Sequence, residues 1–309
     1  METIAIPFLL AVGSLLALQA AANVQLSAAM GIPLGASTLQ LGIGFLLLMA
    51  LAIPIGALGA LDLLDDAEAW HLVGGVGSAV YITAGILLFP RLGAIVTVGL
   101  FIAGQMLASL LLDGSGWLGV EREPLDVWPA LGAVAVVWGV LLIVRPQAGG
   151  EALERAARQS VGWIALALVA GAVLPVQGAI NSQLRADLDA PIAVGAVSFV
   201  VATTAMAILL LLSLGLGAVA RPRIRPLRRL PWWGWLGGLC GATYVTSVFI
   251  LIPEVGVAPT IALTVAGQQV ASVFVDRYGL LALPRRAISR ARLLGVGLLL
   301  AGVALIQLA

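Results

Sequence analysis

Apolar residues fall into ten long runs along the chain, and short polar connections separate these runs. Each run has about the 20 residues that a helix needs to cross the hydrocarbon core of a bilayer. Only helices and closed barrels satisfy every backbone polar group in lipid, and runs this long and continuous favour helices. The predicted spans are 4–28, 34–56, 70–89, 92–112, 126–144, 161–184, 191–214, 232–252, 257–275 and 291–308. The pattern predicts an all-α integral membrane protein with ten transmembrane helices.

The second half of the chain repeats sequence motifs of the first half. The phrase QAAANVQL, which begins at Gln19, returns 158 residues later as QGAINSQL, which begins at Gln177. A second block repeats at an offset of 163 residues and pairs Tyr81 with Tyr244. Internal repeats in a membrane chain with many spans are typical of secondary transporters, whose binding sites lie near the midplane where the repeats meet.

The repeats set the expected domain organisation. We expect a first five-helix repeat over residues 1–146, a cytoplasmic linker over 147–160 that forms a short amphipathic helix, and a second five-helix repeat over 161–309. Because five is an odd number, the second repeat must enter the membrane from the opposite face. The two repeats are therefore predicted to be inverted and related by a pseudo-two-fold axis in the membrane plane.

The arginines indicate how the chain is oriented. Arg122 and Arg185 fall on the side of the N-terminus, whereas the other fourteen arginines fall on the opposite side. Cytoplasmic loops carry an excess of basic residues. We therefore expect a multi-pass protein of the cell (inner) membrane with both termini outside the cytoplasm.

Composition supports a membrane location and excludes several functions. Hydrophobic residues make up 61% of the chain and charged residues only 10%, with a mean hydropathy of +1.11. Soluble domains have about a quarter charged residues. The net charge of +1 comes from short connections and forms no basic face, so the lipid bilayer is an expected partner and nucleic acid is not.

Paired amides in the first helix of each repeat are the leading candidates for a solute site. Gln19 and Asn23 lie four residues apart on one helix face, and Gln177 and Asn181 repeat the arrangement. Amides donate and accept hydrogen bonds, so they suit a polar, neutral or zwitterionic solute. The alternative is that these amides join helices as packing contacts.

The third and fourth helices of each repeat add further polar residues at membrane depth. Such residues are costly in lipid and usually face a bundle interior or cavity, although those beside small residues can also serve helix packing. The candidates for solute binding in these helices are Gln105, Ser109, Gln268, Ser272, Tyr81 and Tyr244.

Asp113 and Asp276 are the acidic residues that both repeats share, and they lie where the fourth and ninth helices leave the membrane. They are candidates for gating or ion coupling, or for capping a helix end. No ionisable Asp, Glu, His, Lys or Arg falls near the centre of a predicted span. The sequence has no phosphate-binding loop, no zinc-protease motif and no nucleophile with a nearby base, so we expect no cofactor, no metal and no enzyme activity.

The two five-helix repeats, the G-x5-Q-x3-N-x-Q-L phrase, the proline that follows it and the later G-Q-x3-S-x3-D phrase resemble the YdcZ-type branch of the drug/metabolite transporter superfamily. The resemblance covers nearly the whole chain, which is similar to a fused pair of single-repeat proteins related to EamA-type transporters. It implies alternating access and export of metabolites or drug-like compounds. The related small multidrug resistance proteins use a first-helix glutamate, whereas this chain has Gln19 and Gln177 in the corresponding regions.

The expected function is therefore a secondary transporter, in the direction of efflux, that moves a small-molecule solute through a central cavity. Because both repeats lie in one chain, a single copy could form the whole path. A passive channel lined by the same amides and a membrane-embedded structural protein without transport are the alternatives.

Overall fold

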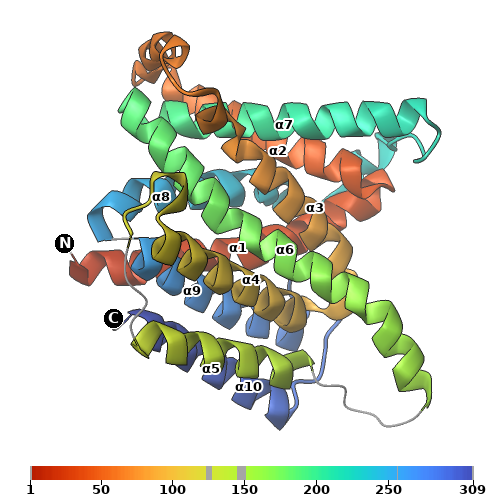
Figure 1. The fold of residues 1–309 in the computed structure, drawn as a ribbon. Helices are drawn as coiled ribbons and strands as arrows, with labels where there is room; N and C mark the ends of the chain where they lie inside the picture. Colours follow the sequence, from red (N-terminus) through yellow and green to blue (C-terminus); the bar gives the residue numbers. More distant parts are fainter. Residues whose placement is uncertain (1, 123–126, 145–150, 256, 308–309) are drawn as a thin grey trace.

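The structure is a computed structural model that describes residues 2–122, 127–144, 151–255 and 257–307. An α-helix occupies each of the ten predicted apolar runs, so the predicted all-α class is confirmed (Figure 1). The α-helices are α1 Glu2–Met30, α2 Pro33–Ala52, α3 Gly75–Leu92, α4 Ala94–Ser115, α5 Val127–Val144, α6 Glu151–Leu188, α7 Pro191–Gly215, α8 Leu236–Val255, α9 Val257–Tyr278 and α10 Arg290–Gln307. Short 3-10 helices lie between them, at η1 Ala57–Asp65, η2 Ala69–Gly74, η3 Trp117–Gly119, η4 Arg225–Arg229, η5 Trp232–Trp235 and η6 Leu280–Ala282.

Seven helical segments of the described chain are long and apolar enough to cross a membrane. They comprise α1, α2, α4, α6 and α7, together with α3 preceded by η2 and α8 preceded by η5. The apolar part of α5 is shorter, over Val127–Ile143. Among the described residues, length and composition therefore identify seven of the ten predicted spans.

Several helix ends differ from the prediction. α6 begins at Glu151, so the described part of the predicted 147–160 linker belongs to the same helix as the span that follows it; residues 147–150 lie outside the described chain. The break between α3 and α4 was expected at Pro90 but lies at Gly93, whose φ of 84° turns the chain. Pro90 lies in the last turn of α3, where it leaves only the Ile86 carbonyl without its helical N–H partner. The Arg91 guanidinium of the same turn donates a hydrogen bond to the Leu87 carbonyl at 2.6 Å.

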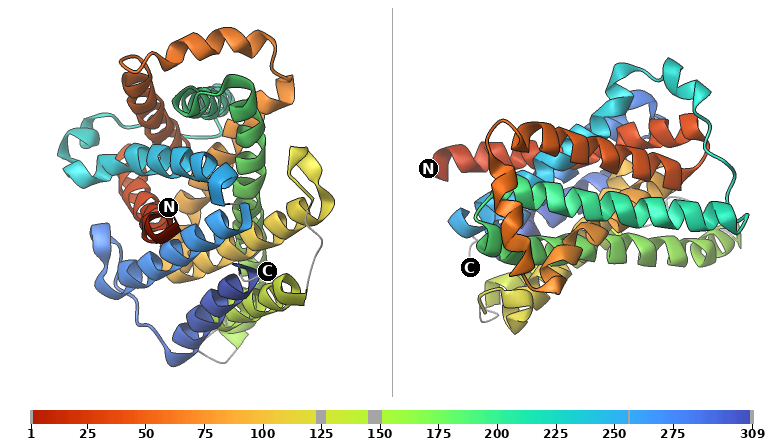
Figure 2. Two further views of the ribbon diagram at one scale, coloured as in Figure 1. Left: turned by 90° about the vertical axis from the view of Figure 1, so that its left-hand side faces the viewer. Right: turned by 90° about the horizontal axis from the view of Figure 1, so that it is seen from above.

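The major helix contacts join the two halves of the chain rather than stay within them. α1 packs on α9, and α6 packs on α4; α2 packs on α7, and α5 on α10. Exchange of the two halves turns the α1–α9 contact into the α6–α4 contact. The same exchange leaves the α2–α7 and α5–α10 contacts as they are. In Figures 1 and 2 the α2–α7 pair and the α5–α10 pair form opposite edges, with the remaining helices between them.

Glycines allow two of these contacts to be very close. A Cβ atom on Gly13 of α1 would lie 1.8 Å from the Thr264 carbonyl oxygen of α9. A Cβ atom on Gly171 of α6, the residue matched to Gly13, would lie 2.1 Å from the Phe101 carbonyl oxygen of α4. Backbones at such distances need residues without side chains, as is common between membrane helices.

The start of α1 and the end of α10 lie at the same end of the bundle (Figures 1 and 2). Matched prolines begin the second helix of each half, since Pro33 opens α2 and Pro191 opens α7. Proline is favoured at this position because the first N–H groups of a helix have no partner within it.

Candidate solute site

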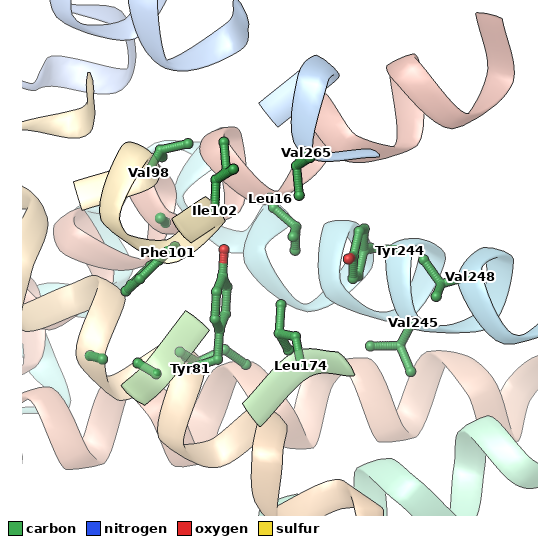
Figure 3. Packing of buried hydrophobic residues seen from close by; sticks show 14 of the residues in the cluster. Leu16, Tyr81, Val98, Phe101, Ile102, Leu174, Tyr244, Val245, Val248 and Val265 are labelled. Atoms are coloured by element: carbon green, nitrogen blue, oxygen red, sulfur yellow. The ribbon is translucent and has the colours of Figure 1, made fainter. Parts of the chain in front are cut away.

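Two cavities lie side by side in the middle of the bundle and share Leu174, Tyr244 and Val245 in their walls. The first lies between α1, α3, α6, α7 and α8, and Gln19, Ser78 and Tyr81 are its further polar residues. The polar residues of the second cavity besides Tyr244 are Gln177 and Asn181. In Figure 3 Leu16 and Leu174 lie between the rings of Tyr81 and Tyr244.

The second cavity extends toward one end of the bundle. Its walls follow α6 from Leu174 to Asn181 and α8 from Tyr244 to Phe249, toward the C-terminal ends of both helices. The first cavity contains Gln19 but not Asn23, one turn further along α1. The space is therefore asymmetric about the middle of the bundle, although the two halves have matched sequences.

The amides of the second half are held by side chains. The Gln177 amide is within hydrogen-bond distance of the Ser78 hydroxyl through both its oxygen, at 2.9 Å, and its nitrogen, at 2.8 Å. The Asn181 amide nitrogen donates to the Ser198 hydroxyl at 3.2 Å, and the Asn181 oxygen is buried without a partner. The predicted residues Gln177 and Asn181 thus reach the cavity wall together.

The amides of the first half differ from them. Gln19 is 2% exposed, lines the first cavity and makes no hydrogen bond within the described chain. Asn23 is buried against Gly237, and its oxygen has no partner. The neighbouring Gln40 donates to the Gly237 carbonyl at 3.1 Å.

The two predicted tyrosines are buried, but their contacts are unequal. The Gln268 amide nitrogen of α9 donates to the Tyr81 hydroxyl, and the Tyr81 ring lies against Phe101, with centroids 4.6 Å apart. Figure 3 shows the Tyr81 hydroxyl pointing toward Phe101 and Ile102 of α4. Gln105, the residue matched to Gln268, is fully buried, and neither atom of its amide has a partner.

The two predicted serines of α4 and α9 make local hydrogen bonds. Ser109 donates to the Gln105 carbonyl at 2.8 Å, and Ser272 donates to the Gln269 carbonyl at 2.7 Å. Both are buried, and neither of the two central cavities includes Ser109, Ser272, Gln105 or Gln268 in its walls. Gln268 is connected to the first cavity by its hydrogen bond to Tyr81, which lines that cavity.

Asp276 joins the two halves at the end of α9. Its carboxylate accepts hydrogen bonds from the Ala94 and Ile95 N–H groups, both at 3.0 Å, at the start of α4. The N-cap residue there is Gly93, which has no side chain to do this. Asp276 therefore caps a helix of the other half, where a negative charge is favoured by the helix dipole. Asp113, the matched acid, is buried at the end of α4.

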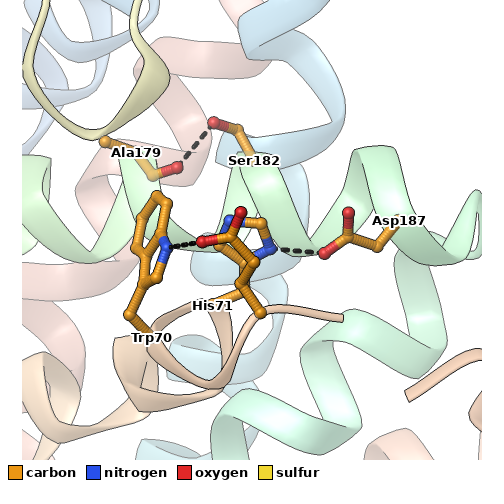
Figure 4. A network of polar contacts seen from close by, with 6 residues as sticks. Trp70, His71, Ala179, Ser182 and Asp187 are labelled. Atoms are coloured by element: carbon orange, nitrogen blue, oxygen red, sulfur yellow. Dashed lines mark hydrogen bonds and ion pairs between the residues drawn. The ribbon is translucent and has the colours of Figure 1, made fainter. Parts of the chain in front are cut away.

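A polar cluster that the sequence analysis did not single out lies near the ends of α3 and α6 (Figure 4). His71 is buried on η2, and its Nδ1 contacts the Asp187 carboxylate of α6. The indole of Trp70 donates to Glu68 and packs edge-on against His71, with ring centroids 4.1 Å apart. This contact gave no sequence signal because the two residues are 116 positions apart in the chain.

Arg185 was predicted only as one of two arginines on the N-terminal side. It donates from Nη1 to the Phe249 and Ile250 carbonyls of α8, each at 2.9 Å. Pro253, four residues after Phe249, has no N–H to donate to that carbonyl, so the arginine takes its place. Among the described residues no group of three His, Cys, Asp or Glu side chains could hold a metal ion.

Comparison with known proteins decides the family. The family described as "Putative inner membrane exporter, YdcZ" matches the chain twice, over residues 4–142 and over residues 162–305. The chain belongs to the YdcZ family. It is accordingly a multi-pass protein of the inner membrane, and the resemblance inferred from the repeated phrases is confirmed.

One curated relative is "Inner membrane protein YdcZ" of Escherichia coli (strain K12). It is 26% identical over 145 residues, which are 47% of this chain and 97% of the relative. The YdcZ protein of E. coli therefore corresponds to about half of this chain. A solved structure titled "Crystal structure of protein" has the same fold over 96% of this chain and 94% of its own, with a TM-score of 0.61 and 18% identity.

Proposed function

We propose that this YdcZ-family protein is a secondary transporter that exports a small organic solute across the cytoplasmic membrane by alternating access. The observation that carries the proposal is the pair of adjoining central cavities, because Gln19 from one half lines the first and the matched Gln177 from the other half lines the second. Polar residues at this depth are costly unless they serve a path or a packing contact. The family description as an exporter supports the direction.

An inverted-repeat arrangement of ten transmembrane helices fits the contacts between the halves. The close crossing of α1 and α9 at Gly13 has its counterpart where α6 crosses α4 at Gly171. The second pair of glycines behaves in the same way, since Gly267 approaches the Leu10 carbonyl and Gly104 the Leu168 carbonyl. Exchange of the two halves thus reproduces both contacts, as expected for repeats related by a two-fold axis.

The orientation follows from the arginines. With fourteen of them on one side, we place the basic loops in the cytoplasm and both termini outside. The ends of α6 and α8, toward which the second cavity extends, then lie on the outer side. In this proposal the structure corresponds to a state whose cavity is nearer the outer surface.

The unequal tyrosines support a second state. Gln268 bonds Tyr81 across the repeats, whereas Tyr244 and Gln105, which occupy the matched positions, do not form this contact. In the alternative state we expect Tyr244 to pair with Gln105 and Tyr81 to be released. Exchange of one hydrogen bond for its counterpart would make the two states close in free energy, as alternating access requires.

The remaining predicted residues take supporting roles in this proposal. Ser109 and Ser272 bond their own helices, and the Asp276 carboxylate is engaged by α4, so a helix-end role fits this acid better than solute binding. Gating by Asp113 and Asp276 would act through the ends of α4 and α9. The proposal needs no cofactor or metal and assigns no enzyme activity.

The test compares metabolites inside and outside cells that overproduce the wild-type chain with those of cells that overproduce a Gln19→Ala/Gln177→Ala variant at the same membrane level. We expect at least one organic compound to be shifted outward by the wild type only. The absence of any difference across broad chemistry would refute the proposal. For a shifted compound, saturable flux with counterflow in proteoliposomes would separate a transporter from a passive channel.

A further inference from the structure

We propose that the two matched glutamines have different tasks: Gln19 binds the solute, whereas Gln177 is held by the protein. We infer further that the solute is uncharged and presents a hydrogen-bond donor beside an acceptor, as amides, lactams and ureas do. This inference rests on the proposed transport function, because it concerns the same cavity.

A single sequence difference between the repeats separates the two glutamines. Ser78 of α3 is matched 163 residues later by Gly241 of α8. The Ser78 hydroxyl contacts both atoms of the Gln177 amide. A solute that bonded Gln177 would have to displace a hydrogen bond that already exists, with little net gain.

Gly241 leaves the Gln19 amide free. A Cβ atom on Gly241 would lie 2.5 Å from the Gln19 amide nitrogen, so the glutamine occupies the space that a serine side chain would fill. Gln19 makes no hydrogen bond within the described chain, is only 2% exposed and faces the first cavity. A buried amide without a partner is costly, and a solute in the cavity would relieve that cost.

The walls of the cavities indicate the charge of the solute. None of the residues that line the two cavities carries a charge. Two charged groups of the bundle are engaged by backbone groups, because Arg185 donates to the α8 carbonyls and Asp276 accepts from the start of α4. A charged solute would lose its hydration without gaining a counter-charge, at a cost far larger than one amide hydrogen bond recovers.

The Gln19 amide indicates the hydrogen-bonding pattern. A primary amide has a donor and an acceptor side by side, and the same pair in reverse order complements it. The apolar residues Leu16, Ile82 and Phe199 share the cavity wall with Gln19 and would contact the rest of the solute.

The first experiment measures binding to the purified full-length chain in detergent by calorimetry. The probes are two pairs that differ in charge but hardly in shape: nicotinamide with nicotinate, and benzamide with benzoate. We expect at least one of the two amides to bind, and its carboxylate to bind at least tenfold more weakly. Gln19→Ala should weaken amide binding roughly fivefold to tenfold, and Gln177→Ala should weaken it less than twofold.

A second pair of variants keeps the test valid if an alanine variant fails to fold. Gly241→Ser should supply Gln19 with the hydroxyl that Ser78 supplies to Gln177, and so weaken amide binding by a similar factor. The double variant Ser78→Gly/Gly241→Ser exchanges the two environments, and in it Gln177→Ala should become the more damaging substitution. All variants are first checked for a monodisperse elution profile.

Each outcome decides one claim. Failure of both amides to bind, or equal binding of a carboxylate, overturns the solute class. Equal losses in Gln19→Ala and Gln177→Ala overturn the division of tasks. If the chain binds an amide but moves no compound in cells, the transport proposal fails while the solute class stands. If the wild type exports a charged compound, the transport proposal stands and the inferred uncharged solute is refuted.

Discussion

Substitution of Asp276 gives a quantitative test of how the two halves are held together. Its carboxylate is 2% exposed and accepts hydrogen bonds from the Ala94 and Ile95 N–H groups at 3.0 Å. In Asp276→Ala both N–H groups lose this acceptor at the buried start of α4. Asp276→Asn is the matched control, because its amide oxygen has nearly the same position but no charge.

The magnitude follows from these two contacts. A hydrogen bond to a charged group contributes about 1.5–3 kcal/mol, and a buried donor left without a partner costs about 1–3 kcal/mol. These terms overlap, so we expect Asp276→Ala to lower the free energy of unfolding by about 3 kcal/mol. Asp276→Asn keeps one acceptor and loses the charge at the helix end, for which we expect a loss of about 1–2 kcal/mol.

The assay is reversible unfolding of the purified chain in mixed micelles, followed by circular dichroism. A structural cap predicts that the loss of transport in each variant matches its loss of folded protein. Two results would refute this reasoning. One is an alanine variant as stable as the wild type, and the other is an asparagine variant that is stable but completely inactive, which would favour ion coupling instead.

Three further predictions concern packing and buried polar groups. Gly13→Leu should prevent folding, because a Cβ atom there would lie 1.8 Å from a backbone oxygen. Gly162→Leu is the control: no atom lies within 4 Å of its Cβ position, so the yield of monodisperse protein should not change. Arg185→Ala should lower the free energy of unfolding by about 1–3 kcal/mol, because two α8 carbonyls lose their donor. Arg185→Lys should restore part of this loss. Equal stability of the wild type and both variants would contradict the prediction. Gln105→Leu should raise the free energy of unfolding by about 1 kcal/mol, because both atoms of the buried amide lack partners, while it slows transport. A Gln105→Leu variant with normal flux would show that this glutamine has no part in the cycle.

Helix existence and the repeats could be predicted from the sequence because both are local or periodic signals. Twenty apolar residues specify a helix wherever they occur, and the phrase at Gln19 and Gln177 repeats without reference to the fold. A helix in the 147–160 linker was predicted, but its continuity with the span that follows it was not, because the apolar pattern ends where the polar stretch begins. Boundaries depend on capping and on neighbouring helices, which the apolar pattern does not contain.

The candidate site was predictable as a set of residues but not as a set of contacts. The matched positions identified Gln177, but its bond to Ser78 depends on α3 and α6 lying together across the repeats. The same is true of the cap that Asp276 places on α4. The pair of His71 and Asp187 was missed because neither residue is repeated and nothing local joins them.

Opposite responses of two matched tyrosine variants test alternating access most directly. The reporters are single cysteines in a Cys240→Ala background: Val248→Cys lines the second cavity, and Gly85→Cys is its matched position in the other half, where the nearest atom to a new Cβ is 3.7 Å away. Each is labelled with a membrane-impermeant maleimide from the outer and from the cytoplasmic side.

One hydrogen bond of about 1 kcal/mol changes the ratio of two states roughly fivefold. We therefore predict that Tyr81→Phe, which removes the hydroxyl oxygen that accepts the hydrogen bond from the Gln268 amide, lowers outer labelling at residue 248 and raises cytoplasmic labelling at residue 85. Tyr244→Phe should shift both signals the opposite way. Labelling that changes in the same direction in both variants, or in neither, would contradict a cycle in which the two halves exchange roles.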